Sequence, residues 1–300
     1  MWSRWDPEHC NGGLRWQIFS YNSGYNYKNS ISNGGLFLMA ARLARYTDNA
    51  TYGDTAEIVW DWSNEIGFIH NSTSVWQIWD GANIEENCTE FTKIEWSYNY
   101  GVYMAGCAYM YNYTENEVWM ERAHDLLLSA TSLFFNSSNS IMYEQYCQAA
   151  GMCDNDQRSF KSIFSRCLGL TAVLIPSTHE DIMGLLTKSA VGAAQSCSGG
   201  SDGHTCGLDW TFPGWDGKYG LGEQMCALEV MQNLLVSQLP APYKNNTGGS
   251  SVGNVNAGST KLVTLNQNEL TITGGDKAGA GILTAVVLAG LLGGSIWMVW

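Results

Sequence analysis

Charged side chains are scarce in this sequence. They make up 14% of the 300 positions, against roughly a quarter in an average soluble domain. Those present are unbalanced, with 28 acidic and 15 basic residues and a formal net charge of −13. Because Lys and Arg form no cluster or stripe, we expect no nucleic acid among the partners of this protein.

Patterns that bind metal ions are missing as well. The nine Cys residues include no C-x-x-C pair, and the five His residues show no ligand spacing. A structural zinc site needs such closely spaced ligands. We therefore expect no metal and no cofactor.

Aromatic and apolar residues, in contrast, are plentiful. Hydrophobic residues account for 45% of the chain, with 13 Trp and 15 Tyr, which is enough for a large core and excludes disorder over most of the length. Low charge combined with many Trp, Tyr, Asn, Gly and Ser suits a surface that binds neutral polar ligands, of which sugars are the leading class.

The spacing of the apolar residues predicts helices. Alternating runs typical of strands are scarce, whereas stripes with helical period recur along the chain. These stripes occupy residues 36–44, 56–66, 98–110, 119–134, 160–168, 182–190 and 222–235. The predicted fold class is all-α.

Four of the predicted helices begin behind polar-aromatic stretches. The stretches recur about every 60 to 70 residues, at 25–29, 96–101, 155–161 and 216–220. An ordinary amphipathic helix follows most of them, so the pattern indicates a degenerate repeat of helix hairpins. In a ring of hairpins, these four helix starts would lie at one end and surround a cleft.

Sequons indicate a secreted glycoprotein. Six N-x-S/T acceptors are present, at Asn49, Asn71, Asn87, Asn112, Asn136 and Asn245. A single sequon arises easily by chance in an Asn-rich chain, but six together favour passage through the secretory pathway.

The cysteines fit the same compartment. Two pairs lie close together in Gly-, Ser- and Asp-rich segments where a disulfide can close a loop, namely Cys147 with Cys153 and Cys197 with Cys206. Cys10 and Cys88 flank polar loop motifs and are candidates for a long-range bridge. The other three lie within helical patterns and are expected to be buried thiols, at Cys107, Cys167 and Cys226.

The C-terminal part changes in composition. Residues 241–281 are rich in Gly, Ser, Asn and Thr and are predicted to be a disordered linker, and residues 282–300 are uncharged and apolar. That apolar tail is long enough to span a bilayer, with small residues upstream and no basic residues after it, as in a GPI-attachment signal. Gly274, Asn256 and Gly258 are candidate attachment sites. A tail-anchored transmembrane helix is the alternative.

The N-terminal residues lack the signal peptide that a GPI-anchored protein needs. Met1–Asp6 contains no apolar region of a secretory signal peptide. Because a GPI signal requires entry into the secretory pathway, we expect that the chain starts late.

Cys10–Ile18, with the sequence C-N-G-G-L-R-W-Q-I, resembles the C-G-G-G-L-R-W-Q-I motif of fungal glycoside hydrolase family 76. The resemblance continues in order over nearly the whole chain, through residues 27–34, 41–47, 80–82, 87–89, 96–99, 156–161 and 195–200. It implies an (α/α)6 toroid that acts on α-1,6-linked mannose. Residues 1–240 would form a partial catalytic domain, with about seven of the twelve helices.

The family's catalytic pair is absent from the sequence. Family members carry two adjacent Asp residues upstream of the C-G-G-G-L-R-W-Q-I motif, which the family's retaining mechanism uses as nucleophile and general acid/base. No two consecutive Asp residues occur in these 300 positions. Asn155–Gln157 resembles the context of the pair but belongs to a later motif. We therefore name no catalytic residue and expect the pair upstream of Met1.

Ten residues of the shared motifs are candidates to line a sugar cleft, by stacking on pyranose rings or bonding to hydroxyls. They are Arg15, Trp16, Lys28, Asn29, Asp80, Trp96, Tyr98, Asn99, Asp156 and Gln157. Structural alternatives stay open. A Trp can simply fill the core, Asp80 can shape a turn, Lys28 can pair with a nearby acid, and Asp156 can serve a helix start.

Two functions follow from the resemblance. The first is a cell-wall α-1,6-mannan endo-hydrolase or transglycosidase. Its partners would be mannan or the mannose core of GPI glycans, and the membrane through the C-terminal anchor. It would be located at the cell surface, on the plasma membrane or in the wall. The second is a non-catalytic mannan- or GPI-glycan-binding wall protein that lacks the Asp pair.

Overall fold

The computed structural model describes residues 1–71, 73–247 and 272–299. The chain divides into two units, Met1–Gly248 and Gly249–Trp300. Most of the predicted linker lies outside the described residues.

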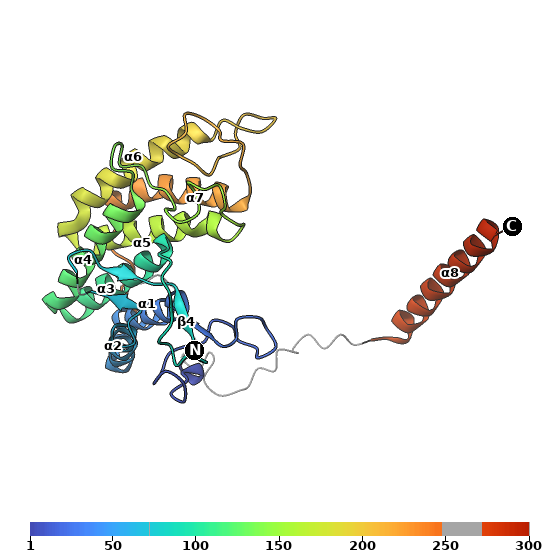
Figure 1. Cartoon of the computed structure of the whole chain (residues 1–300), viewed down its shortest axis with the longest axis horizontal. Coiled ribbons are helices and arrows are strands. Elements are labelled where there is room, and N and C mark those ends of the chain that lie inside the picture. The colour runs from blue at the N-terminus through green and yellow to red at the C-terminus, as the bar shows by residue number, and fades with distance from the viewer. Residues whose placement is uncertain (72, 248–271, 300) are drawn as a thin grey trace. The chain divides into compact units, whose positions relative to one another are not determined.

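In its described residues, the first unit contains seven α-helices, each of which overlaps one of the predicted apolar stripes (Figure 1). They are α1 (Ser30–Thr47), α2 (Ala50–Glu65), α3 (Ser97–Thr114), α4 (Glu117–Phe134), α5 (Phe160–Leu174), α6 (His179–Ser196) and α7 (Leu221–Gln232). Short 3₁₀ helices add η1 (Trp2–Arg4), η2 (Gln157–Ser159), η3 (Pro176–Thr178) and η4 (Asn233–Gln238). The all-α prediction is confirmed.

The odd-numbered helices form an inner row. α1 packs on α3, α3 on α5, and α5 on α7, while α2, α4 and α6 each pack against the odd-numbered helix before them. α3 is buried on all sides from Asn99 to Met110, whereas the outer helix α4 buries only one stripe, which includes Trp119, Ala123 and Leu126. This difference is expected when hairpins place one helix inside and one outside a ring.

Small residues allow the inner helices to approach closely. A Cβ atom added at Gly106 of α3 would lie 2.3 Å from the Phe37 ring of α1. The aromatic core around this contact includes Trp60, Tyr103 and Trp119. Such interlocking packing supplies most of the stability of the unit.

Short antiparallel strands, which were not predicted, lie between the helices. One sheet has the order β1 (Tyr27–Asn29), β4 (Gly81–Asn83) and β5 (Phe91–Thr92), and a second pairs β2 (Ile69–His70) with β3 (Gln77–Ile78). In the first sheet Lys28 pairs with Ala82. Strands of two or three residues are too short to show an alternating pattern in sequence.

Three disulfides close in the unit, at the candidate pairs Cys10–Cys88, Cys147–Cys153 and Cys197–Cys206. Cys107, Cys167 and Cys226 are buried thiols. Burial raises the pKa of the Cys167 and Cys226 thiols to about 12, which makes both unreactive at neutral pH.

The sequon asparagines differ in exposure. Asn49, Asn71, Asn87 and Asn245 are exposed, and Asn112 and Asn136 are half-buried. The Asn112 Oδ1 accepts a hydrogen bond of 2.6 Å from Arg45 Nε. Four of the six acceptors are therefore exposed to solvent, although the side chains of Asn49 and Asn71 also form hydrogen bonds with Thr51 and Asn64.

The second unit contains α8 (Gly274–Val299). Its segment Gly274–Ile296 has a mean hydropathy of 1.9 and is long and apolar enough to cross a membrane. The helix begins at Gly274, eight residues before the apolar stretch that starts at Ile282. Thr273 and Asp276 exchange hydrogen bonds there as a capping box, which starts the helix within the predicted linker.

Candidate functional site

The segment Cys10–Ile18 is held firmly against α1 and α2. Gly13 has a φ of +88°, and a Cβ atom at this position would lie 2.3 Å from the Trp62 ring. The Trp62 indole donates to the Cys10 carbonyl at 2.9 Å. The Asn33 side chain of α1 accepts from the Leu14 amide at 2.7 Å and donates to its carbonyl at 3.1 Å. The first part of the motif, from Cys10 to Leu14, is therefore fixed against the two helices.

Alternation along this segment separates the predicted residues into two sets. Arg15 bridges Lys28 in an antiparallel pair, and the Trp16 amide donates to the Tyr27 carbonyl at 2.7 Å. Neighbouring residues of an extended segment point to opposite sides. Arg15 and Lys28 therefore share one side, while Trp16, Tyr27 and Asn29 share the other.

The second side faces a groove of about 210 Å³ at the starts of α1, α3 and α5. Seven of the ten predicted residues are brought together here, and Tyr27, Asp154 and Phe160 join them. The groove is lined by Trp16, Tyr27, Asn29, Asp80, Trp96, Tyr98, Asp154, Asp156, Gln157 and Phe160.

Helix termini position most of these side chains. Asn29 is the N-cap of α1, where its side chain accepts from the Ser32 amide at 3.2 Å. Trp96 is the N-cap residue of α3, and Phe160 is the first residue of α5. Because the inner helices run side by side, their starts meet at one end.

The aromatic residues of the groove differ in what they offer a ligand. Trp16 is 48% exposed and presents ring surface to solvent. Tyr98 stacks on Phe160 with ring centroids 3.9 Å apart, and Trp96 is buried with its edge against the same ring. Trp96 therefore belongs largely to the core, and Trp16 is the free platform.

The acidic residues of the groove are held differently from one another. Asp80 accepts a hydrogen bond of 2.7 Å from the Tyr27 hydroxyl. Burial raises the pKa of Asp80, and hydrogen bonds from Tyr27 and Trp96 offset part of that shift. Asp154, not Asp156, serves the helix start: its carboxylate accepts from the amides of Asp156 and Gln157. The Asp156 side chain remains exposed.

The groove is acidic. Three of its described lining residues are Asp, and none of those lining residues is Lys, Arg or His. Across residues 1–71, 73–247 and 272–299, no group of three or more His, Cys, Asp or Glu side chains could hold a metal ion. The carboxylates are thus arranged as hydrogen-bond acceptors for hydroxyl or amine groups.

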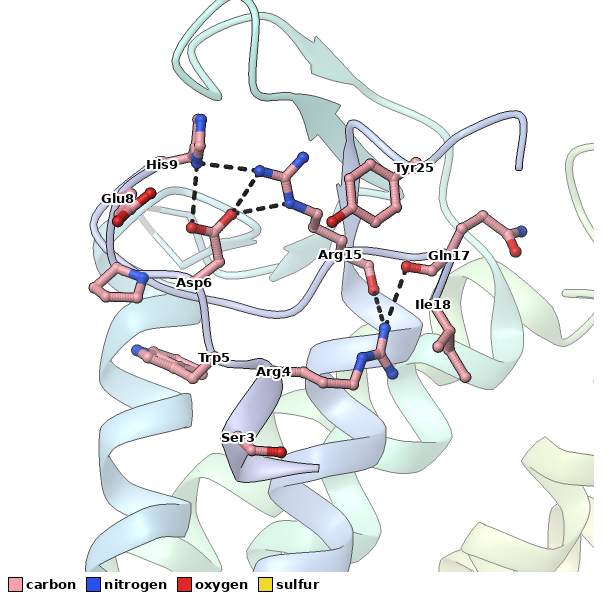
Figure 2. A pocket seen from close by; sticks show the side chains of 11 residues that line it. Ser3, Arg4, Trp5, Asp6, Glu8, His9, Arg15, Gln17, Ile18 and Tyr25 are labelled. Atoms are coloured by element: carbon pink, nitrogen blue, oxygen red, sulfur yellow. Dashed lines mark hydrogen bonds and ion pairs between the residues drawn. The ribbon is translucent and has the colours of Figure 1, made fainter. Parts of the chain in front are cut away.

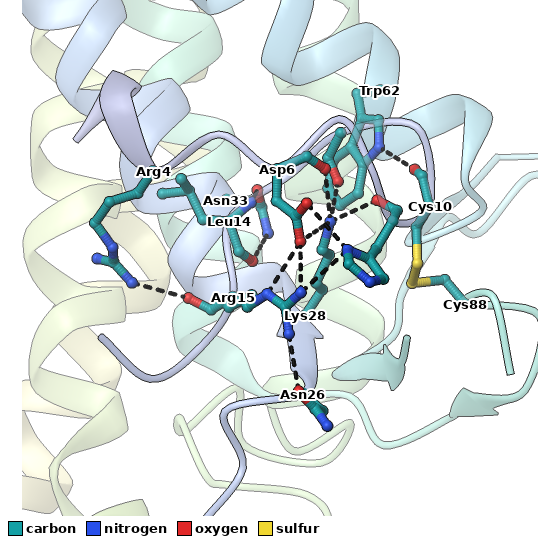
Figure 3. A network of polar contacts seen from close by, with 12 residues as sticks. Arg4, Asp6, Cys10, Leu14, Arg15, Asn26, Lys28, Asn33, Trp62 and Cys88 are labelled. Carbon is teal, nitrogen blue, oxygen red and sulfur yellow. Dashed lines mark hydrogen bonds and ion pairs between the residues drawn. A yellow bond between two sulfur atoms is a disulfide. The ribbon is translucent and has the colours of Figure 1, made fainter. Parts of the chain in front are cut away.

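Lys28 and Arg15 lie on the opposite side, in a separate network (Figure 3). The Lys28 ammonium, which is fully buried, donates to the carbonyls of Asp6, His9 and Gly12 at 3.0, 2.6 and 2.5 Å. It lies 3.4 Å from the Asp6 carboxylate, so it pairs with an acid, the alternative noted for it above. Burial lowers the pKa of Lys28 to about 8.

Arg15 lines a different pocket, of about 420 Å³ (Figure 2). Its guanidinium donates to Asp6 at 3.0 Å and to Asn26 at 2.8 Å, and lies over the Tyr25 ring. Arg4 crosses the floor of this pocket and donates to the carbonyls of Arg15 and Gln17. These cations are satisfied internally and brace the segment that carries Trp16.

Asn99 also lies outside the groove lining. It is completely buried in the first turns of α3, and neither its Nδ2 nor its Oδ1 atom has a hydrogen-bond partner in the structure. The sequence placed it among the candidate sugar-binding residues because it belongs to the shared motif at 96–99 and its amide can bond to hydroxyls.

Three groove residues were missed from the sequence. Tyr27 lies in the polar-aromatic stretch before α1, and its alternation with Lys28 was not recognised. Asp154 forms a capping pair with Gln157, whose side chain accepts from the Asp154 amide at 3.1 Å. That D-x-x-Q spacing was a usable signal. Phe160 was assigned to the polar-aromatic stretch 155–161 and to the apolar stripe of its helix, but not to the groove.

Comparisons with known proteins agree with this architecture. Glycosyl hydrolase family 76 matches residues 1–246. The chain is 58% identical over 302 residues to mannan endo-1,6-alpha-mannosidase DCW1 of Candida albicans, an alignment that covers 100% of this chain and 66% of that protein.

Solved structures show the same fold. The crystal structure of Dfg5 from Chaetomium thermophilum in complex with glucosamine matches with a TM-score of 0.81 and 37% identity, over 87% of this chain and 63% of that one. An inactive double-Asp variant of α-1,6-mannanase GH76A from Salegentibacter sp. HEL1_6, in complex with α-1,6-mannotriose, matches at 0.64 with 17% identity, over 78% and 65%. The chain thus spans less than two thirds of the length of these relatives. It belongs to glycosyl hydrolase family 76, as its motifs predicted.

Proposed function

We propose that this chain supplies the sugar-binding groove of a cell-wall endo-hydrolase or transglycosidase that acts on α-1,6-linked mannose. The observation that carries the proposal is the groove itself, where an exposed Trp16 and the acceptors of three carboxylates meet at the starts of three inner helices. The naming of DCW1 as a mannan endo-1,6-alpha-mannosidase and the mannotriose in the Salegentibacter structure support the substrate class.

The chemistry of the lining suits a pyranose ligand. An exposed indole can cover the apolar face of a sugar ring, and carboxylates accept hydrogen bonds from its hydroxyls. Asp80 is oriented by Tyr27, so its free lone pairs have a fixed direction. The hydroxyls of a sugar bound here would give up hydrogen bonds to water and form hydrogen bonds to carboxylates that are already oriented.

An acidic groove also suits an amino sugar. Dfg5 of Chaetomium thermophilum was crystallised with glucosamine, whose amine can carry a positive charge. Asp80, Asp154 and Asp156 would favour that charge over a neutral hydroxyl. This supports the glycan of GPI anchors, which joins mannose to glucosamine, as one substrate alongside mannan.

We propose that cleavage of the glycosidic bond depends on groups other than those of this groove. A retaining mechanism uses two carboxyl groups roughly 5 Å apart, one as nucleophile and one as general acid/base. The Salegentibacter enzyme is inactive when two consecutive Asp residues are replaced, and these 300 residues contain no consecutive Asp pair. We propose that the pair is supplied by sequence outside this chain. Water or a sugar hydroxyl would then complete the reaction as hydrolysis or transfer.

Location at the cell surface is part of the same proposal. α8 has the length and hydropathy of a membrane segment. It would act either as a GPI-attachment signal or as a retained anchor. Release of the mature protein from cells by phosphatidylinositol-specific phospholipase C would support the first and contradict the second.

Titration calorimetry with α-1,6-mannotriose tests the groove. We expect W16A to weaken binding about two- to thirteenfold, equivalent to roughly 0.5–1.5 kcal/mol for one aromatic contact. Trp2 is a matched control because it is 46% exposed and lies outside the groove. No binding by the wild-type chain, or an equal loss in W2A, would contradict the proposal.

The second candidate function, a non-catalytic wall protein that binds mannan, is favoured by the missing Asp pair. The genomic sequence 5′ of the Met1 codon separates the two functions. An in-frame stretch that encodes adjacent Asp residues supports the enzyme, and its absence supports the binding protein. In either case the 300-residue chain should release no sugar from α-1,6-mannan, and measurable turnover would refute the assignment of cleavage to the missing pair.

A further inference from the structure

The helix that carries two groove residues starts without a cap of its own. Trp96, the N-cap residue of α3, makes no side-chain capping bond. The first amides of a helix need acceptors from outside the helix, because no preceding turn supplies them. Since Trp96 and Tyr98 both line the groove, whatever fixes this turn also fixes the groove.

Glu144 provides the missing acceptors. Its carboxylate accepts from the Ser97 amide at 3.0 Å and from the Ser97 hydroxyl. Ser97 lies between the two groove residues, and Glu144 comes from the connection between α4 and α5, 47 positions further along the chain. Glu144 and Ser97 are both completely buried, so neither contacts a ligand directly.

Glu144 is itself held in place by hydrogen bonds through Gln148. Its amide donates to Gln148 Oε1 at 3.1 Å, and the Gln148 amide group donates to Asp209 at 3.0 Å. The buried Lys161 ammonium of α5 donates to Gln148 Oε1 at 3.2 Å and also to the Leu208 carbonyl. The backbone at Glu144 is therefore held by a network that joins it to α5 and to the 208–209 loop.

The connection between α4 and α5 also contacts the groove residue Trp96. Tyr146, two residues after Glu144, packs edge-to-face on Trp96 with ring centroids 5.2 Å apart. The Cys147–Cys153 disulfide closes the loop just beyond it. Hydrogen bonds on one side and ring contact on the other thus fix Trp96 relative to one loop.

We infer that Glu144 is a positioning residue of the groove: it caps α3 from a distant loop and thereby holds Trp96 and Tyr98 in place. The geometry of this cap stands independently of the ligand. Its effect on sugar binding rests on the proposed function.

Hydrogen exchange and mannotriose titration of the full chain test the two parts separately. In E144A we expect amide exchange at residues 97–99 to accelerate roughly 2- to 30-fold, the range for loss of an N-cap, and mannotriose affinity to fall. E144Q retains one acceptor and should recover part of both effects. E223Q is the matched control, because Glu223 is equally buried but is paired with Arg158, and it should leave exchange at Ser97 unchanged.

A double-mutant cycle distinguishes positioning from a general loss of stability. If Glu144 acts through Ser97, the affinity losses of E144Q and S97A should be strongly non-additive. Additive losses, or unchanged exchange at residues 97–99 in E144Q, would overturn the inference. Should E144A fail to fold, E144Q against E223Q still decides the question. If the wild-type chain does not bind mannotriose, the proposed function fails, while the exchange data still test the cap.

Discussion

At the scale of single residues, neighbouring side chains of a short extended segment point in opposite directions, and only every second one reaches the groove. Trp16 and Asn29 face it, and their neighbours Arg15 and Lys28 do not. All four share motifs with the same family, so sequence resemblance alone gave them equal weight. The direction of each side chain depends on the pairing of Arg15 with Lys28. A strand of two or three residues is too short for this pairing to be predicted from the sequence.

Gly13 should tolerate no side chain. The change G13A places a Cβ atom against the Trp62 ring at a φ of +88°, so we expect a loss of at least about 2 kcal/mol in the free energy of unfolding. Gly35 in α1 is the control, because a Cβ atom added there would meet no other atom within 4 Å. At that position, G35A should stabilise the helix by roughly 0.5–1 kcal/mol. Equal effects in denaturant titrations would contradict this account of the motif.

Glu144 should make stability depend on pH. Burial raises the pKa of its carboxyl to about 7, and the groups that face it are Ser97 and Tyr98 on α3, Lys161 on α5 and Cys226 on α7. Between the ordinary Glu value and pH 7 the folded chain binds more protons than the unfolded chain, so stability falls as pH rises.

Unfolding of wild type and E144Q at several pH values measures this contribution. Relative to E144Q, the wild-type chain should lose on the order of 3 kcal/mol between about pH 4.5 and pH 7, and little beyond. A difference between the two proteins that stays constant over this range would show that Glu144 does not titrate there.

At the scale of elements, the helices were predictable and the connections between them were not. Each of α1–α7 buries long apolar residues at helical spacing, a signal that survives in sequence. In the sheet of β1, β4 and β5, the pairing of β1 with β4 joins residues more than 50 positions apart. The cap of α3 is likewise invisible to local patterns, because its acceptor is 47 residues away. Most groove residues near helix starts were therefore predicted, whereas Phe160 and the supporting residue Glu144 were missed.

The last helix of the inner row should limit solubility. α7 exposes Leu221, Met225 and Leu228, which lie on one face at helical spacing. A closed ring of six hairpins would cover such a face, and an uncovered one promotes association. We expect L228E to reduce light scattering on concentration and to change the free energy of unfolding by less than about 0.5 kcal/mol. The buried neighbour Val230 is the control, since V230E should prevent folding. Equal aggregation of wild type and L228E would contradict this view of α7.

At the scale of the whole molecule, the order of the motifs along the chain predicted the family and the helical fold, and both are confirmed. Seven helices in Met1–Gly248 stand against twelve in a complete (α/α)6 toroid. The chain also spans 66% of the length of DCW1. The proposed sugar-binding groove lies within these residues and the proposed acidic pair does not, so the proposal predicts that sugar binding and bond cleavage can be separated.

The most direct test of the central claim is an NMR titration of the indole N–H signals with α-1,6-mannotriose. We predict saturable shifts of the assigned Trp16 signal, smaller shifts of Trp96, and none of Trp2, with Asp80→Asn weakening the response. A cello-oligosaccharide of equal length should give weaker shifts. Unperturbed Trp16 at saturating mannotriose, or shifts confined to tryptophans outside the groove, would contradict the assignment of this groove to mannose.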